Sequence, residues 1–182
     1  IHCGLVGSEM CIRDSSLKID AFIESFHRFL GSSLALNRIL KQTHEIDDTL
    51  AEQLDQLELA IADSKLRHIN EPDFMRYNNE LDLVNMLREA FLSAGKMVGD
   101  IHSRITPETE KVLLIEVEKE LDIFLLHLEN VDIKTEAVVS QKKRINRTVK
   151  RYNAALRRIR ANLEQRWIVM ASLVDAQTQL LN

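Results

Sequence analysis

Residues 134–182 read KTEAVVSQKKRINRTVKRYNAALRRIRANLEQRWIVMASLVDAQTQLLN and contain neither glycine nor proline. Seam residues in this stretch recur at spacings of three and four, with Arg166 as the one charged member: Ile145, Val149, Tyr152, Leu156, Ile159, Leu163, Arg166, Met170, Leu173 and Gln177. This heptad pattern predicts a helix that packs lengthwise against other helices. At 1.5 Å per residue it would be roughly 70 Å long, so the rest of the chain has to supply long helical partners.

The preceding sequence carries similar seams, broken at short turn signals. Four helices are predicted, at about residues 17–69, 73–105, 107–130 and 134–182. A kink at residues 31–33 is an open alternative within the first helix, because Gly31 is followed by two serines. Pro72 and Pro107 fit the first turn of a helix. Together these features predict an all-α fold, an elongated antiparallel four-helix bundle with coiled-coil-like seams.

The composition of the chain limits the classes of function. The chain has 182 residues, with only 5 Gly and 2 Pro, as expected of a mostly helical protein. Its formal net charge of −4 argues against a dedicated nucleic-acid binder. No run of about 20 apolar residues is present, so contact with a membrane is expected only through flanking segments outside this sequence.

The first fifteen residues do not share the helical pattern. They contain both cysteines, Cys3 and Cys11, and resemble translated adaptor sequence at the ends of metagenomic reading frames. We therefore expect residues 1–15 to be a disordered, non-native tag, followed by a single helical domain over residues 16–182. A domain without cysteine suits an oxidising compartment, although many cytosolic domains also lack cysteine.

The last predicted helix carries an unusual concentration of positive charge. Between Gln141 and Arg166 there are ten basic residues and one acid, Glu164. Seven of the basic residues share the face opposite the seam, here called the basic stripe: Lys143, Arg144, Arg147, Lys150, Arg151, Arg157 and Arg158. Two interpretations remain open, an anion-binding surface or charge complementarity with the acidic stretch between Gln42 and Ser64, within the bundle or across a dimer.

Candidate binding residues follow from this charge. The strongest are on the last predicted helix: Lys150, Arg151, Arg157, Arg158 and Arg166. Arg166 interrupts the apolar seam, so it either binds an anion at an interface or extends its charged end to water while Trp167 takes the core position. A small anionic ligand or a partner protein is therefore expected here.

Catalytic and metal-binding patterns are not found. Glu24-x-x-His27 is half of a helical di-metal motif, and no second half occurs, so we predict neither a metal site nor a cofactor. The sequence has no phosphate-binding loop, dinucleotide fingerprint or G-x-S-x-G element. These features predict a non-catalytic protein.

The long seams, including Leu50, Leu54, Leu57 and Ile61, and the two proline turns resemble the extracytoplasmic sensor regions of bacterial transmembrane receptors. They are similar in style to the helical sensor modules of chemoreceptors and of trimethylamine-oxide-type sensor kinases. The resemblance covers residues 17–182 and implies a periplasmic, non-catalytic signal-transduction domain. It also implies a homodimer, which we expect to form through the last helix. The alternative is a cytoplasmic coiled-coil scaffold that binds an acidic partner or nucleic acid through the basic stripe.

Overall fold

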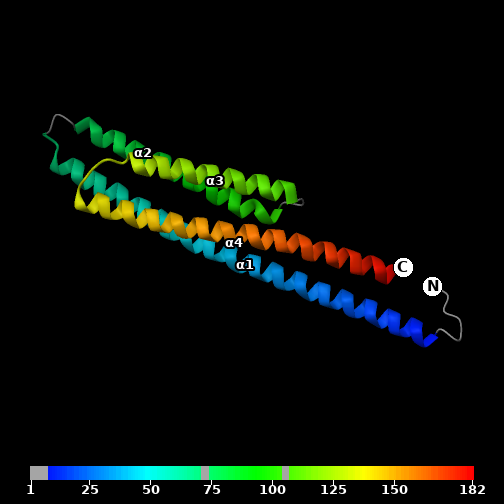
Figure 1. The fold of residues 1–182 in the computed structure, drawn as a ribbon. Coiled ribbons are helices and arrows are strands. Elements are labelled where there is room, and N and C mark those ends of the chain that lie inside the picture. Colours follow the sequence, from blue (N-terminus) through cyan, green and yellow to red (C-terminus); the bar gives the residue numbers. More distant parts are fainter. Residues whose placement is uncertain (1–7, 71–73, 104–106) are drawn as a thin grey trace. The chain divides into compact units, whose positions relative to one another are not determined.

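The computed structural model of the protein describes residues 8–70, 74–103 and 107–182, and these residues are almost entirely helical. Four α-helices and one short 3₁₀ helix follow one another along the chain (Figure 1): α1 (Ser8–Arg67), α2 (Phe74–Gly99), η1 (Asp100–Ser103), α3 (Pro107–Asn130) and α4 (Glu136–Leu181). No strand occurs in the described ranges. The predicted all-α class is therefore confirmed.

The helix boundaries follow local chemistry. Helix α3 begins at Pro107, whose fixed φ and missing N–H suit a first helical position. Its first turn also carries Glu108 and Glu110, which face the positive end of the helix dipole. Helix α4 is capped by Thr135, whose Oγ1 accepts a hydrogen bond of 3.4 Å from the backbone N–H of Val138.

Helix α1 differs from its sequence prediction at two places. It already begins at Ser8, so residues 8–15, expected to be disordered, form its first turns. The physical reason is that no glycine or proline stands between Ser8 and Leu30 to stop the helix from extending. The helix also continues through residues 31–33, where a kink was considered. Residues 1–7 and the predicted turn at Pro72 lie outside the described residues.

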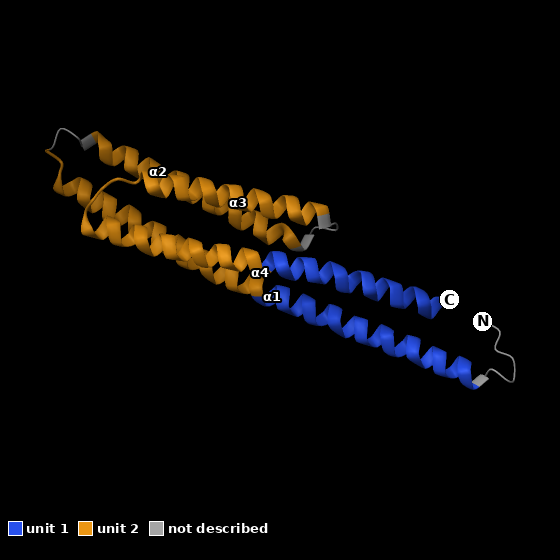
Figure 2. Ribbon diagram, viewed as in Figure 1, with its two compact units in different colours: residues 1–38, 159–182 blue, residues 39–158 orange. Residues whose placement is uncertain are grey.

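The chain divides into two compact units, coloured in Figure 2. Unit 2 consists of residues 39–158 and therefore contains parts of α1 and α4 together with all of α2 and α3. One hydrophobic cluster in this unit draws side chains from all four α-helices, including Leu54 on α1, Leu87 on α2, Phe124 on α3 and Val149 on α4. Each of these four side chains is fully buried.

Unit 1 contains the first part of α1 and the last part of α4, residues 1–38 and 159–182. Leu36, Ile159 and Leu163 are buried in it. The Asn162 side-chain amide donates a hydrogen bond of 3.3 Å to the backbone carbonyl of Ser32, which ties the two helical segments together.

The buried face of α4 follows the predicted seam up to Leu163 and then differs by one position. Val169 and Ala176 are buried, whereas Met170 is half-buried and Gln177 is exposed. Because the seam repeats every 3.5 residues, the middle of the buried face falls between two neighbouring residues of the helix. Either neighbour can then face inward, and the helix buries Ala176 instead of the polar Gln177.

Candidate functional site: a cavity between α1 and α4

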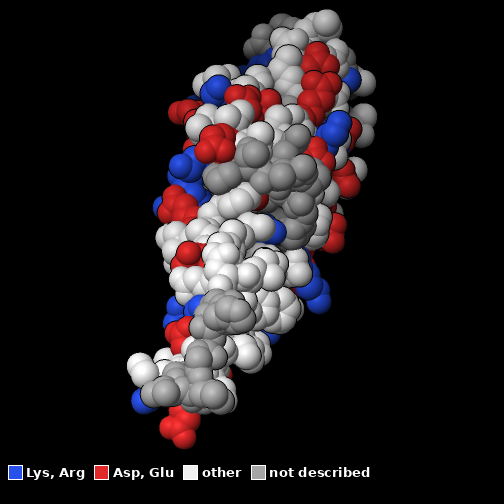
Figure 3. All heavy atoms as spheres, turned by 90° about the vertical axis from the view of Figure 1, so that its right-hand side faces the viewer, with Lys and Arg blue, Asp and Glu red and all other residues white. Residues whose placement is uncertain are grey.

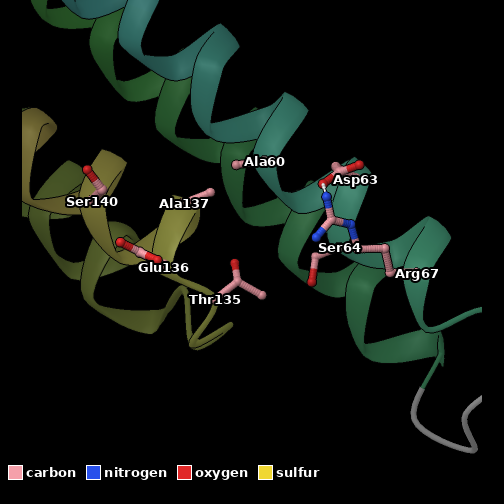
Figure 4. Close-up of a pocket in the computed structure, with 8 residues that line it drawn as sticks. All are labelled: Ala60, Asp63, Ser64, Arg67, Thr135, Glu136, Ala137 and Ser140. Atoms are coloured by element: carbon pink, nitrogen blue, oxygen red, sulfur yellow. Dashed lines mark ion pairs between the residues drawn. The ribbon is translucent and has the colours of Figure 1, made fainter.

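A cavity of about 490 Å³ lies in unit 2 where α1 ends and α4 begins. Figure 4 shows its lining in two groups, one on each helix. The residues from α1 are Ala60, Asp63, Ser64 and Arg67, and those from the start of α4 are Thr135, Glu136, Ala137 and Ser140. Each group includes an alanine and a serine, whose small side chains leave space between the two helices.

The hydroxyl of Ser64 is the most informative group in this cavity. The Ser64 side chain is only 2% exposed, and its Oγ has no hydrogen-bond partner. A buried hydroxyl without a partner costs free energy of roughly 1–3 kcal/mol. Ser64 lines the cavity, and a rotation of its side chain would bring the enclosed Oγ to a bound molecule that could supply the missing hydrogen bond.

The cavity lining also carries charged groups of both signs. Arg67 pairs with Asp63, with Nη2 and Oδ2 3.0 Å apart, as the dashed line in Figure 4 indicates. Glu136 belongs to the first turn of α4. The described lining residues therefore carry two carboxylates and one guanidinium, so their formal charge is negative by one. The first backbone N–H groups of α4 add a positive helix end.

A second cavity, of about 370 Å³, shares Thr135 with the first. His68 and Tyr77 line it, with their rings stacked at a centroid distance of 5.9 Å. The Nδ1 of His68 lies 2.7 Å from the backbone carbonyl of Ser64, which favours the tautomer with the proton on Nδ1. The stacked His68 ring therefore fixes the end of α1 beside the larger cavity.

The connection between α3 and α4 is anchored to α2. Arg76 donates hydrogen bonds to the backbone carbonyl and to Oδ2 of Asp132, at 2.9 and 3.0 Å. The buried Glu80 carboxylate accepts the backbone N–H of Asp132. Burial is the main cause that raises the pKa of Glu80, against the hydrogen bond from Asp132, which lowers it. These contacts hold the segment that leads into the cavity.

A polar layer crosses the core elsewhere in unit 2. Asp47 Oδ1 and Tyr152 Oη are buried without a hydrogen-bond partner. Burial raises the pKa of Asp47 to about 6, and His44, 3.8 Å away, acts in the opposite direction. Burial, followed by the negative charge of Asp47, also raises the pKa of Tyr152. These unsatisfied groups therefore make the polar layer contribute less to the free energy of folding than the apolar layers do.

The five binding residues predicted from the sequence lie away from this cavity, since none of them lines it. Lys150, Arg151, Arg157 and Arg158 are exposed on α4 in unit 2, and Arg166 is half-buried in unit 1. Ser64 is not among the binding residues predicted from the sequence. A usable signal was the set of small residues at helical spacing, Ala60 with Ser64 and Ala137 with Ser140.

Gly95 does not mark a close helix approach. An added Cβ at Gly95 would have its nearest contact at 3.8 Å, on Asp47 Oδ2, and one at Gly99 would meet nothing within 4 Å. Neither glycine is therefore needed for packing. The described residues contain no group of three or more potential metal ligands and no helix apolar enough over a sufficient length to span a membrane.

Comparison with family models, with curated proteins and with solved structures gives no match. The cavity, the polar layer and the surface charge of this chain are the features that bear on its function.

Proposed function

We propose that this chain is a non-catalytic helical sensing domain, which binds a small hydrophilic ligand in the cavity between α1 and α4. The single observation that carries the proposal is Ser64, a residue that lines the cavity and whose buried hydroxyl has no hydrogen-bond partner. The extracytoplasmic sensor of a bacterial membrane receptor is the setting that we propose for such a domain.

The lining indicates the class of ligand. Among the residues that the structure describes, no aromatic or large apolar side chain lines the cavity, which disfavours an apolar compound. Asp63 is already paired with Arg67, so Glu136 gives the described lining an uncompensated negative charge, which favours a ligand group with positive charge. We therefore propose a small molecule that carries an ammonium group, with further polar atoms for Ser64 and for the first N–H groups of α4. This differs from the anionic ligand expected from the sequence.

The proposed architecture is an antiparallel four-helix bundle in unit 2. Two contacts between α1 and α4 support opposite helix directions. Arg158 Nη1 donates to Gln42 Oε1 at 2.8 Å, and Thr148 Oγ1 donates to Gln53 Oε1 at 2.7 Å. From the first contact to the second, the position on α1 moves forward along the chain, from Gln42 to Gln53. The position on α4 moves backward, from Arg158 to Thr148, as expected of antiparallel helices.

The polar layer provides a means of responding to the ligand. A sensor needs two helix arrangements that are close in free energy. The unsatisfied groups of Asp47 and Tyr152 lower the stability of the present arrangement. A ligand that draws α1 and α4 together at the cavity would then shift α4 by a small distance relative to α1.

Differential scanning fluorimetry tests ligand binding. The full chain is heated with putrescine, ethanolamine or glycine, and with acetate as an anionic control. We expect at least one amine to raise the melting temperature in proportion to the logarithm of its concentration, and acetate to have no effect. Without ligand, Ser64→Ala should unfold at the same temperature as the wild type or at a slightly higher one, because the substitution removes a buried hydroxyl that has no partner. It should lose most of the amine effect.

Ser172→Ala is the matched control variant. Its hydroxyl bonds only to the carbonyl of Ile168 in its own helix and lies outside the cavity. It should respond to the amine as the wild type does. Equal responses of Ser64→Ala and the wild type, or no response to any amine, would contradict the proposed site.

A further inference from the structure

The basic stripe has no acidic partner among the residues that the structure describes. All seven of its residues are exposed. Within the described residues, six of them take part in no ion pair, and the seventh, Arg158, binds the neutral side chain of Gln42. Intrachain charge complementarity, one of the two sequence interpretations, therefore does not explain the stripe.

The opposite face of α4 is already used. Ile145, Val149 and Tyr152 on the seam are at most 1% exposed, and the first two belong to the core cluster of unit 2. A partner of this part of α4 must therefore contact the outer face, which is the basic stripe.

An acidic surface of the same chain matches the stripe in spacing. On α1, Glu45, Asp48 and Glu52 are exposed and take part in no ion pair with a described residue. We call these three residues the acidic patch. Asp55 and Glu58, which follow them, are already bound by Arg88 of α2.

The spacing of the acidic patch is three and four residues, which places its carboxylates on one helix face over roughly 10 Å. Arg144, Arg147 and Arg151 of the basic stripe have the same spacing of three and four. Two such helix faces can be laid against each other with each acid near an arginine.

We propose that two copies of this chain associate through these surfaces, with the basic stripe of each copy against the acidic patch of the other. A two-fold axis then forms the same contact twice, so that the association closes at two copies. This inference goes beyond the proposed function, because it concerns the surface of unit 2 and not the cavity.

Charge complementarity within one sequence favours a second copy over nucleic acid. The chain has a formal net charge of −4, and the acidic patch would repel phosphate. The two aromatic residues near the stripe in sequence are Tyr152, which is buried, and Trp167, which belongs to unit 1, so the stripe lacks exposed rings for base stacking. On the face drawn in Figure 3, acidic and basic side chains are interspersed, unlike the single sign of charge along the stripe.

Exposed ion pairs are individually weak and are screened by salt. The association should therefore be strongest at low ionic strength, and it should weaken as the salt concentration approaches 1 M, where the Debye length is about 3 Å.

Charge-reversal variants test the pairing by analytical ultracentrifugation of the full chain. One variant carries Arg144→Glu, Arg147→Glu and Arg151→Glu, and the other carries Glu45→Lys, Asp48→Lys and Glu52→Lys. All six positions are exposed, so circular dichroism should show unchanged folding. We expect the wild type to dimerise at low salt and each variant alone to be monomeric. An equimolar mixture of the two variants should dimerise again, because both contacts regain opposite charges.

A control variant reverses three exposed lysines on α2 and α3, by Lys96→Glu, Lys111→Glu and Lys119→Glu. It should dimerise as the wild type does. A wild-type protein that stays monomeric at low salt, variants that still dimerise alone, or a mixture that does not recover would overturn the proposal. So would a wild-type monomer that binds duplex DNA through Arg147 and Arg151, because the stripe would then serve nucleic acid.

Discussion

Both carboxylate oxygens of Glu80 accept the backbone N–H of Asp132, at 3.1 and 3.2 Å, so that α2 holds the first residues after α3. Glu80 is only 5% exposed, and replacement by alanine would leave that N–H without its acceptor. We expect Glu80→Ala to lower the free energy of unfolding by roughly 1–3 kcal/mol, as for other buried hydrogen-bonding groups left unpaired. Urea titration measures this loss.

Glu80→Gln is the matched control, because its side-chain carbonyl can still accept the bond from Asp132. It should lose clearly less stability than Glu80→Ala. Equal losses for both variants would show that the contact with Asp132 does not stabilise the connection.

Asp47 should make unfolding depend on pH. Its pKa in the folded chain is about 6, above the ordinary value of 3.8, so the folded state holds a proton that the unfolded state has released. The contribution of the protonated Asp47 carboxyl to the free energy of unfolding is complete below pH 3.8, and it is lost as the pH rises through about 6. Asp47→Asn, which cannot ionise, should raise the stability at pH 7 by roughly 1–3 kcal/mol.

The same substitution should have little effect near pH 4, where the wild-type carboxyl is mostly neutral in the folded state. Chemical unfolding at the two pH values gives the comparison. A destabilisation by Asp47→Asn at pH 7 would show that the charged carboxylate, contrary to its burial, supports the fold.

Tyr152 should tolerate the loss of its hydroxyl but not of its ring. The side chain is 1% exposed and Oη has no hydrogen-bond partner. Tyr152→Phe should therefore be neutral or stabilise the chain by up to about 1 kcal/mol, whereas Tyr152→Ala should cost about 3–5 kcal/mol through the cavity it leaves. Thermal unfolding separates these outcomes. A large loss in Tyr152→Phe would reveal a hydrogen bond to Oη.

Gly31 offers a stabilising substitution in unit 1. It lies inside α1, and an added Cβ would meet nothing within 4 Å. Gly31→Ala should stabilise the chain by roughly 0.5–1 kcal/mol, because alanine loses less backbone entropy in a helix than glycine. The melting temperature should rise accordingly. A fall would indicate that the backbone near Gly31 has to bend, as the kink considered from the sequence would require.

The heptad seams were predictable because burial along a helix repeats with the sequence. Leu50, Leu54, Leu57 and Ile61 are all fully buried, as their spacing requires. The bounds of α3, residues 107–130, also coincide with the sequence expectation, since proline at one end and an apolar run before the other mark them locally.

The cavity was not predictable in the same way. It exists because the end of α1 meets the beginning of α4, two segments that are far apart in the sequence. No local pattern shows whether Ser64 finds a hydrogen-bond partner. Likewise, the basic stripe was predictable from the sequence. That it has no acidic partner among the described residues follows only from the packing of the helices.

Ligand binding in the cavity is tested most directly by a nuclear magnetic resonance titration of the ¹⁵N-labelled full chain with ethanolamine. Saturable amide shifts at Ser64, Glu136 and Ala137, absent when acetate is added and much reduced in Ser64→Ala, are the predicted result. Amide shifts that leave these three residues unchanged, or no shifts at ethanolamine concentrations on the order of several millimolar, corresponding to binding weaker than about −4 kcal/mol, would contradict the proposed ligand site.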